Sequence, residues 1–365
     1  MKKRKLQRKT WLLLGLTVLV LAIGAYVLLF PPKPKQVLVN GTNVNPVSYS
    51  EETFLNRLSF AYPEVAKRLL KEDEQEVYVI PGLEQSQAIV HSGSKAGQVG
   101  IATDMDPQGL VIIEDKYVAI SGYSKSKAYN SVIWLLDKKT GAYVKTLALD
   151  DIDHVGGITY DEDHDRLWVA TVDKEKDAQV EALSLAAIEA YDLNQSQQPI
   201  AFDYSVDLAD VKLSSYLTYH AGKLYVGYFD QSSNGILATY PVSADGQLSG
   251  LINAKGEAEP EQTWATAEKI QGISFYGNVI LLSQSYSSQN SKLFVFENRL
   301  SDPKFDLKTD DAVASLTLPA YLEQIIGHKN QVFLLFESAS HKYRQNPFLI
   351  HMDRVIKIDI SDLVP

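Results

Sequence analysis

The sequence predicts an all-β protein, a β-propeller, and the first observation behind this prediction is an internal repeat. Residues 270–285 (IQGISFYGNVILLSQS) and 323–338 (EQIIGHKNQVFLLFES) align without a gap, with Gln271 over Gln324. Each stretch is an apolar strand, a short polar turn and a second apolar strand, which is typical of repeat architectures. Three further stretches follow the same plan: 108–123, 156–171 and 216–228.

The spacing of these units is the second observation. The aligned positions are Gly109, Gly157, Tyr216, Gly272 and Ile325, which gives intervals of 48, 59, 56 and 53 residues. This period is too short for an array of βαβ crossovers and suits four-stranded blades. The sequence therefore predicts five blades.

The second half of each unit is the third observation. A polar loop ending in asparagine precedes a further strand, and these residues are Asn130, Asn234, Asn290 and Asn346. Unit two departs from the plan, with a longer loop expected over 173–187. In unit one, residues 137–141 (DKKTG) and the strand 143–149 predict a tight hairpin in which the glycine supplies a positive φ.

The ring also needs a closing strand, because the fifth unit ends at Pro365 after only three strands. Residues 87–103 contain two apolar stretches, AIVHS and QVGIATD, and we expect one of them to become the outer strand of the last blade. This predicts closure by three C-terminal strands and one N-terminal strand. A six-bladed ring is the alternative, and it would need four strands from 76–103.

An uncleaved membrane anchor is predicted at the N-terminus. Residues 11–30 form an uncharged apolar run of the length that a transmembrane helix needs. Only basic charges precede it, so we expect the N-terminus in the cytoplasm and the rest of the chain outside. A cleaved signal peptide is the alternative, but no small-x-small pattern follows the run. The basic residues are Lys2, Lys3, Arg4, Lys5, Arg8 and Lys9.

A helical segment separates the anchor from the propeller. Its apolar positions fit a helical pattern, with Ser48 or Ser50 as the N-cap and Pro63 opening a second helix. A membrane-proximal stalk is the favoured interpretation, and a separate functional module is the alternative. The predicted domains are a cytoplasmic tail (1–10), the anchor (11–30), a linker and helical stalk (31–75) and an extracytoplasmic propeller (76–365).

Composition limits the partners. The chain has no cysteine, which excludes a lipid-modified cysteine, disulfides and thiolate metal sites. Eight of the 35 basic residues precede residue 36, so the exported part carries 27 basic residues against 45 acidic ones, a formal charge of −18. This charge argues against nucleic acid as a partner. The expected partners are the bilayer, through 11–30, and an envelope protein or glycan, on the surface of a Gram-positive cell.

One face of the propeller is expected to carry the function. In blades of four antiparallel strands, the loop that enters the inner strand and the loop between the second and third strands lie on the same face. The binding-face candidates on these loops are Asp104, Gln108, Tyr123, Asn130, His154, Tyr216, Gln271, Tyr286, Asn290, Gln324, His341 and Arg344. Alternatively, the glutamines bond to backbone and the asparagines shape turns. His154 is the first choice because imidazole can act as acid, base, ligand or donor.

No catalytic or metal motif is complete. The seven histidines are scattered, and the Asp- and Glu-rich turn 161–165 lacks the glycine and final glutamate of an EF-hand loop. No cofactor is predicted, and Asp104 and Asp106 are the weak candidates for calcium in the central channel. Residues 92–95 and 139–141 imitate two motifs of penicillin-interacting enzymes without their structural context, and no G-x-S-x-G or P-loop is present.

Two segments resemble known propeller families. The D-x-x-T-G hairpin at 137–141 resembles those of quinoprotein and YncE-like propellers. Residues 154–170 (HVGGITYDEDHDRLWVA) resemble blades of NHL and gluconolactonase-type propellers. These resemblances cover single blades, imply a propeller fold and carry no activity with them.

The expected function is a binding or scaffold module for a protein, peptide or surface glycan. The alternative is a metal-assisted hydrolase or lactonase with a central site around Asp104, His154 and Gln271. The residue types expected at the axis decide between the two, because they are mostly amides, glycines and tyrosines. Such groups suit binding better than acid–base chemistry, which needs converging carboxylates or histidines.

Overall fold

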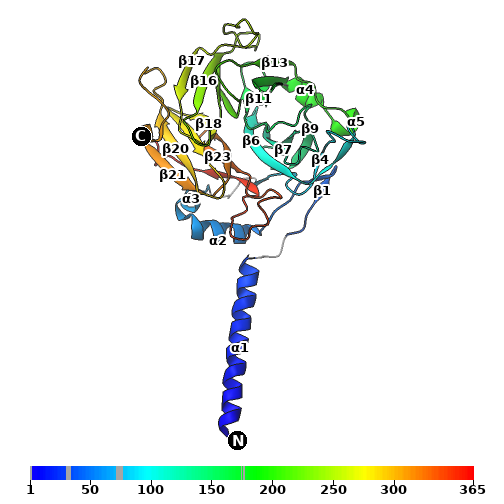
Figure 1. Ribbon diagram of the computed structural model, residues 1–365, viewed down its shortest axis with the longest axis vertical. Helices are drawn as coiled ribbons and strands as arrows, with labels where there is room; N and C mark the ends of the chain where they lie inside the picture. Colours follow the sequence, from blue (N-terminus) through cyan, green and yellow to red (C-terminus); the bar gives the residue numbers. More distant parts are fainter. Residues whose placement is uncertain (1, 30–33, 71–76, 174, 176) are drawn as a thin grey trace.

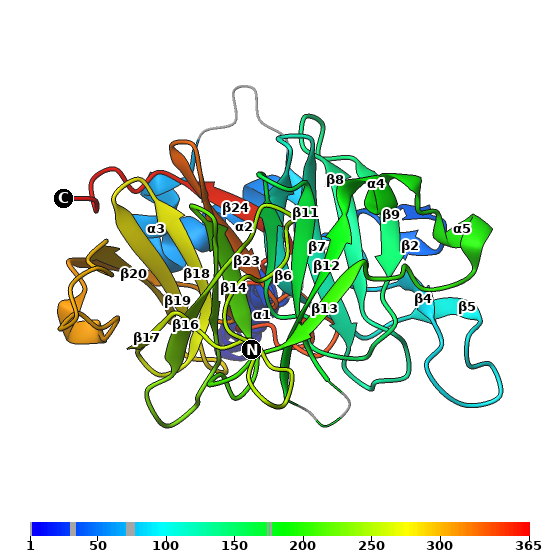
Figure 2. The same cartoon turned by 90° about the horizontal axis from the view of Figure 1, so that it is seen from above.

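The computed structural model describes residues 2–29, 34–70, 77–173, 175 and 177–365. Five four-stranded antiparallel sheets are arranged as the blades of a propeller (Figures 1 and 2). The inner strands of consecutive blades contact one another, and the inner strand of the fifth blade contacts that of the first, which closes the ring. The predicted five-bladed fold is confirmed.

The strands run outward from the axis in chain order. Blade one is β6 (Met105–Ile113), β7 (Tyr117–Ser124), β8 (Val132–Asp137) and β9 (Tyr143–Ala148), and blade two is β10 (Ile158–Asp161), β11 (Arg166–Val172), β12 (Ala178–Ser184) and β13 (Tyr204–Asp207). Blade three is β14 (Tyr216–His220), β15 (Lys223–Gly227), β16 (Ile236–Pro241) and β17 (Gln262–Ala265). Blade four is β18 (Ile270–Tyr276), β19 (Val279–Gln284), β20 (Ser291–Glu297) and β21 (Ala314–Leu318), and blade five has β22 (Leu322–His328), β23 (Gln331–Phe336) and β24 (Arg354–Ile358).

An N-terminal strand closes the fifth blade, but it is not the predicted one. β3 (Tyr78–Val79) pairs antiparallel with β24 as the outermost strand. The predicted segment 87–103 instead forms its own hairpin, in which β4 (Ser86–Ile89) pairs with β5 (Val99–Ala102). Glycines at positive φ, Gly93 and Gly97, lie in its connecting loop, so the two apolar stretches of this segment pair with each other.

The predicted stalk packs against the propeller. α2 (Glu51–Ala61) begins at the N-cap Ser50, whose Oγ accepts a hydrogen bond from Thr53 N at 3.3 Å, and α3 (Pro63–Arg68) begins at its proline. Phe54, Leu58 and Val65 are buried in one core cluster with side chains of blades four and five. Burying each such side chain stabilises the fold by about 1.5–3 kcal/mol, so these helices are part of the folded body rather than a free spacer.

The remaining short elements lie at the edge of the ring or in connections. β1 (Leu38–Val39) pairs with β2 (Thr42–Asn43), and η1 (Thr309–Asp311) precedes β21. The loop predicted over 173–187 is mostly ordered structure, because β12 occupies 178–184 and α4 (Leu185–Ala190) follows it, with α5 (Leu193–Ser196) next. The alternation of buried and half-buried side chains in β12 reveals the strand that the irregular repeat obscured.

The N-terminal residues form a helix, α1 (Lys2–Leu29), which stands apart from the propeller (Figure 1). Its side chains are described at Trp11 and 14–26, and they are exposed. The other side chains of the predicted anchor 11–30 lie outside the described residues. Within the described part of the chain, no helix has both the length and the apolar character required to cross a bilayer. The transmembrane anchor stays a prediction from the sequence.

Candidate functional site

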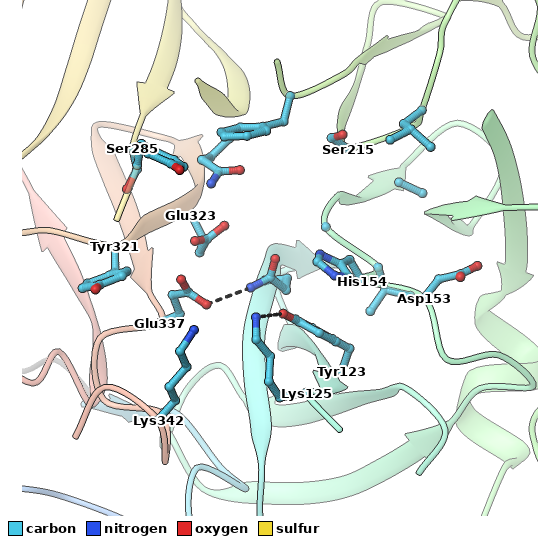
Figure 3. Close-up of a pocket in the computed structure, with 18 of the residues that line it drawn as sticks. Tyr123, Lys125, Asp153, His154, Ser215, Ser285, Tyr321, Glu323, Glu337 and Lys342 are labelled. Carbon is cyan, nitrogen blue, oxygen red and sulfur yellow. Dashed lines mark hydrogen bonds between the residues drawn. The ribbon is translucent and has the colours of Figure 1, made fainter. Parts of the chain in front are cut away.

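A central cavity of about 890 Å³ opens on the loop face. Residues of all five blades line it, because the loops entering the inner strands and the loops after the second strands meet at the axis. The structure brings together five of the predicted candidates here: Gln108, Tyr123, His154, Gln271 and Tyr286. Figure 3 shows the side chains that point into this cavity.

The three glutamines at the aligned inner-strand positions share a backbone irregularity. The pairing register shifts between Pro107 and Leu110, between Ile270 and Gly272, and between Leu322 and Ile325. A β-bulge of this kind re-aims side chains and interrupts the alternation of faces. The bulges therefore explain why polar side chains begin each of these otherwise apolar strands.

Gln324 is a structural residue at the axis. It is 1% exposed, and its Oε1 accepts hydrogen bonds from Leu110 N at 2.9 Å and Ile158 N at 3.1 Å. Its Nε2 donates to Ile158 O at 2.8 Å and to Leu217 O at 3.4 Å. This one amide from blade five ties together the inner strands of blades one, two and three, as the alternative interpretation of the glutamines anticipated.

Three other candidates stabilise loops outside the cavity. Asp104 accepts from Ser126 N at 2.7 Å, which shapes the turn after β7. Asn130 Nδ2 donates to Leu149 O at 2.7 Å, and Asn290 Oδ1 accepts from Tyr62 Oη at 2.7 Å. These contacts are loop-shaping contacts, and none of the three residues lines the cavity.

The last three candidates are also separate from the cavity lining. Tyr216 is fully buried in the core between blades three and four, and His341 is exposed. Arg344 is bound to the N-terminal segment, because its Nη2 donates to Pro46 O at 2.8 Å and its guanidinium forms an ion pair with Glu84.

His154 lines the cavity as a neutral imidazole. Its ring stacks on Tyr123 with a centroid distance of 4.1 Å and an interplanar angle of 19°. Although His154 is partly open to solvent, desolvation of the imidazole, together with the positive charges of Lys125 and Lys127, lowers the pKa of His154 to about 4. The glycines that follow allow close packing: a Cβ on Gly156 would lie 2.4 Å from Ser215 O. His154 can therefore accept or donate one hydrogen bond at neutral pH without carrying charge.

Three buried carboxyls also meet at the cavity, and the sequence reasoning missed this convergence. Asp106 in β6 is 1% exposed, Glu323 in β22 is 5% exposed, and Glu337 after β23 is 9% exposed. Glu323 and Glu337 line the cavity, and Figure 3 shows both pointing into it. The expectation of an axis made mostly of amides, glycines and tyrosines left these carboxyls out. The available signal was the aligned start of unit five, where Glu323 directly precedes the glutamine that repeats between Gln271 and Gln324.

Burial and mutual repulsion raise the pKa values of these carboxyls. For Glu323, desolvation is the largest cause, followed by the charges of Glu337 and Asp106. Desolvation followed by the charge of Asp106 raises the pKa of Glu337, and desolvation raises that of Asp106. Such groups retain a proton to higher pH than ordinary carboxyls and can donate hydrogen bonds.

The basic and aromatic neighbours complete this side of the cavity. Lys125 Nζ donates to Tyr123 Oη at 2.7 Å and lies 3.6 Å from Asp106 Oδ2. Lys342 Nζ lies 5.0 Å from the centroid of the Tyr343 ring. Tyr343 in turn contacts Tyr321, with ring centroids 4.1 Å apart. The cavity therefore offers carboxyls, ammonium groups and aromatic rings within one opening.

Among the described residues, no group of three or more His, Cys, Asp and Glu side chains has the arrangement to hold a metal ion. Residues 161–165 form the turn between β10 and β11, in which Asp161 Oδ1 accepts from Asp163 N at 3.1 Å and from His164 N at 3.2 Å. This turn lies on the face opposite the cavity, as the strand order requires.

Comparisons with known proteins give no family. No family model matches the chain, and no curated protein matches it. Among solved structures, one chain of a nidogen/laminin complex matches at 11% identity and a TM-score of 0.39, covering 70% of this chain and 85% of that one. A glucose dehydrogenase matches at 11% identity and a TM-score of 0.38, with coverages of 72% and 86%. A Bacteroides uniformis protein described as a 6-phosphogluconolactonase matches at 12% identity and 0.36, with coverages of 68% and 70%. These values are too low to transfer an activity.

Proposed function

We propose that this protein is a binding module that takes a ligand into the central cavity of its propeller. The observation that supports this function is the convergence of all five blades on one cavity lined by polar and aromatic side chains. Its volume lies within the range of about 300–1,000 Å³ typical of ligand pockets. A cavity of this size suits a small polar compound or the end of a peptide or surface glycan.

The location of the module follows from the N-terminal sequence. The uncharged run 11–30 behind a basic segment favours a membrane anchor with the propeller outside the cell. The propeller would then present its cavity near the surface of the envelope and bind an envelope protein or glycan. Fractionation and protease treatment of intact cells that express the full chain test this topology. A propeller that resists protease in intact cells and is digested after lysis would lie inside the cell, which would contradict the proposal.

A hydrolase or lactonase is the second candidate, and the three buried carboxyls are the observation that favours it. A carboxyl whose pKa burial raises can act as a general acid near neutral pH. The specific trio expected from the sequence does not form, because Asp104 lies in a turn outside the cavity. Turnover of lactones or aryl esters that disappears in Glu323→Gln and Glu337→Gln would favour this candidate over a module that only binds.

The binding function is tested by a matched pair of double variants. His154 and Gln271 line the cavity, whereas His328 and Gln331 lie at the turn between β22 and β23 on the opposite face. The full-length protein and both pairs of alanine substitutions are screened by thermal shift against saccharides, peptides and small amines. We expect ligands that stabilise the wild type and the His328/Gln331 variant but not the His154/Gln271 variant. Equal stabilisation of all three, or no stabilising compound, would contradict the proposal.

A further inference from the structure

One buried carboxyl of the cavity, that of Glu323, has no partner among the residues that the structure describes. Asp106 Oδ2 lies 3.6 Å from Lys125 Nζ, and Glu337 Oε2 accepts a hydrogen bond from Gln108 Nε2 at 3.4 Å. For the carboxyl of Glu323, no hydrogen bond or ion pair with any other described residue is found. Because buried carboxyls are normally hydrogen-bonded or paired, this one indicates a group that a ligand supplies.

The charges around Glu323 identify the kind of group. Four titratable groups face Glu323. Asp106 belongs to β6 and Tyr123 to β7, Lys125 directly follows β7, and Glu337 follows β23. Both carboxyls repel a negative charge on Glu323, and Lys125 is the cation that opposes them. Lys342 acts on Asp106 and Glu337 instead. Three carboxyls therefore face two lysines, and among the described residues neither lysine forms an ion pair with Glu323.

Both lysines are already engaged. Lys125 is bonded to Tyr123 and lies beside Asp106, and Lys342 lies over the ring of Tyr343. A further cation would have to enter through the cavity, where Glu323 is 5% exposed and points toward the opening (Figure 3). The ring of Tyr321, which also lines the cavity, adds a π face of the type that attracts ammonium groups.

We propose that the cavity recognises an ammonium group of its ligand, which forms an ion pair with Glu323 as the ligand binds. This inference rests on the proposed binding function and names the chemistry that the site selects. The ligand class is a primary amine, whether the amine is the side chain of a lysine or the substituent of an amino sugar. In the absence of the ligand, desolvation and the charges of Glu337 and Asp106 favour a proton on Glu323, and the entering ammonium group displaces this proton to the solvent.

The test compares each amine with its acetylated form. Nα-acetyl-lysine amide and glucosamine are titrated calorimetrically into the full-length protein, next to Nα,Nε-diacetyl-lysine amide and N-acetylglucosamine, which lack the positive charge. We expect one of the two free amines to bind, which identifies the source, and its acetylated form to bind at least about tenfold more weakly, since a buried carboxylate loses its partner. Glu323→Gln, which keeps the shape of the side chain, should weaken the amine by at least about tenfold and leave the acetylated form unaffected.

The displacement of a proton from Glu323 makes amine binding depend on pH. A neutral polar contact would not produce this pH dependence, so it serves as a second readout. The lysine derivative stays protonated across the neutral range, whereas Glu323, whose pKa is raised, must ionise, so the derivative should bind more tightly at pH 8 than at pH 6. For glucosamine the change is smaller because its own amine loses a proton in this range.

Two results would overturn the assignment. Equal binding of free and acetylated forms, or unchanged amine binding by Glu323→Gln, would show that the ammonium group is not what the site recognises. If neither amine binds while other compounds stabilise the protein through His154 and Gln271, the amine assignment fails and the binding function stands. If no compound stabilises it, both fail.

Discussion

The amide of Gln324 is hydrogen-bonded at both ends to the backbone of Ile158. Its Oε1 accepts from Ile158 N at 3.1 Å, and its Nε2 donates to Ile158 O at 2.8 Å. The two residues belong to blades five and two, which are not neighbours in the ring. The innermost point of the propeller is therefore held by a side chain rather than by pairing between strands.

Replacing Gln324 by Leu should destabilise the protein by about 3 kcal/mol, because each buried backbone group left without a partner costs about 1–3 kcal/mol. Gln271→Leu is the matched control, since Gln271 lies at the equivalent position of blade four on the cavity wall and is half-buried. Urea denaturation gives both free energies of unfolding. Equal effects of the two substitutions would contradict the role assigned to Gln324.

The short strand β3 should be essential for closure. Tyr78 is 3% exposed, packs in the core between blades five and one, and its Oη donates to Lys138 O at 2.6 Å. Tyr78→Ala should cost about 3–5 kcal/mol, as for other large buried aromatic residues. Ile101→Ala in β5, where the side chain is 41% exposed, is the control and should cost less than about 1 kcal/mol. The reverse order would favour the closing segment predicted from the sequence.

Glu323→Gln should stabilise the folded protein increasingly as pH rises. The folded-state pKa of Glu323 is raised, so between the unfolded pKa and the folded pKa the native protein binds more protons, and stability falls with rising pH. Each unit of that shift is worth about 1.4 kcal/mol, and glutamine removes it. Unfolding free energies of both proteins, measured from pH 4 to pH 8, should diverge steadily above pH 5. Parallel curves would show that Glu323 titrates normally.

His154 should stay neutral down to about pH 4. Its pKa is lowered to about 4 by desolvation and by two lysines, so its contribution to stability increases as pH rises from 4 to the ordinary histidine range. A nitrogen NMR titration, with the signal assigned by His154→Gln, should give a midpoint near 4 and no change between pH 6 and 8. A midpoint above 6 would mean that neither desolvation nor the two lysines disfavours the charged imidazole.

Close packing of blades two and three should require Gly157. A Cβ at this position would lie 2.5 Å from Leu217 N, so Gly157→Ala should destabilise the protein by about 1–3 kcal/mol. At Gly100 the nearest atoms belong to the side chains of Val90 and Tyr129, at 3.0 and 3.1 Å, and these can move. Thermal denaturation of Gly157→Ala and Gly100→Ala tests this difference, and a smaller loss at Gly157 would contradict it.

The architecture was largely predictable because the strand–turn–strand unit repeats along the sequence at regular intervals. Four of the aligned positions from Gly109 to Ile325 fall in inner strands, and the fifth, Gly157, directly precedes β10; the count of five blades follows from them. The closing strand was not predictable from pattern alone. Both β3 and the β4–β5 hairpin are apolar, and only packing decides that Tyr78 enters the core between blades one and five.

The site was predictable as a face and not as a set of residues. Strand alternation places Gln108, His154 and Gln271 at one cavity. It does not separate Gln324, which holds the axis, from Glu323 beside it, because the bulge between Leu322 and Ile325 decides where each side chain points. The carboxyl cluster depends on such local irregularities in blades one and five.

Filling the cavity tests the central claim most directly. Ser215 lines the cavity wall contributed by blade three, and Ser215→Trp would occupy the opening without altering a charge, while Ser196→Trp places the same ring on an exposed helix end. Calorimetry with the strongest ligand from the thermal-shift screen should show binding to the wild type and Ser196→Trp, and a loss of at least about a hundredfold, or about 2.7 kcal/mol, in Ser215→Trp. Unchanged affinity in a folded Ser215→Trp protein would contradict the account.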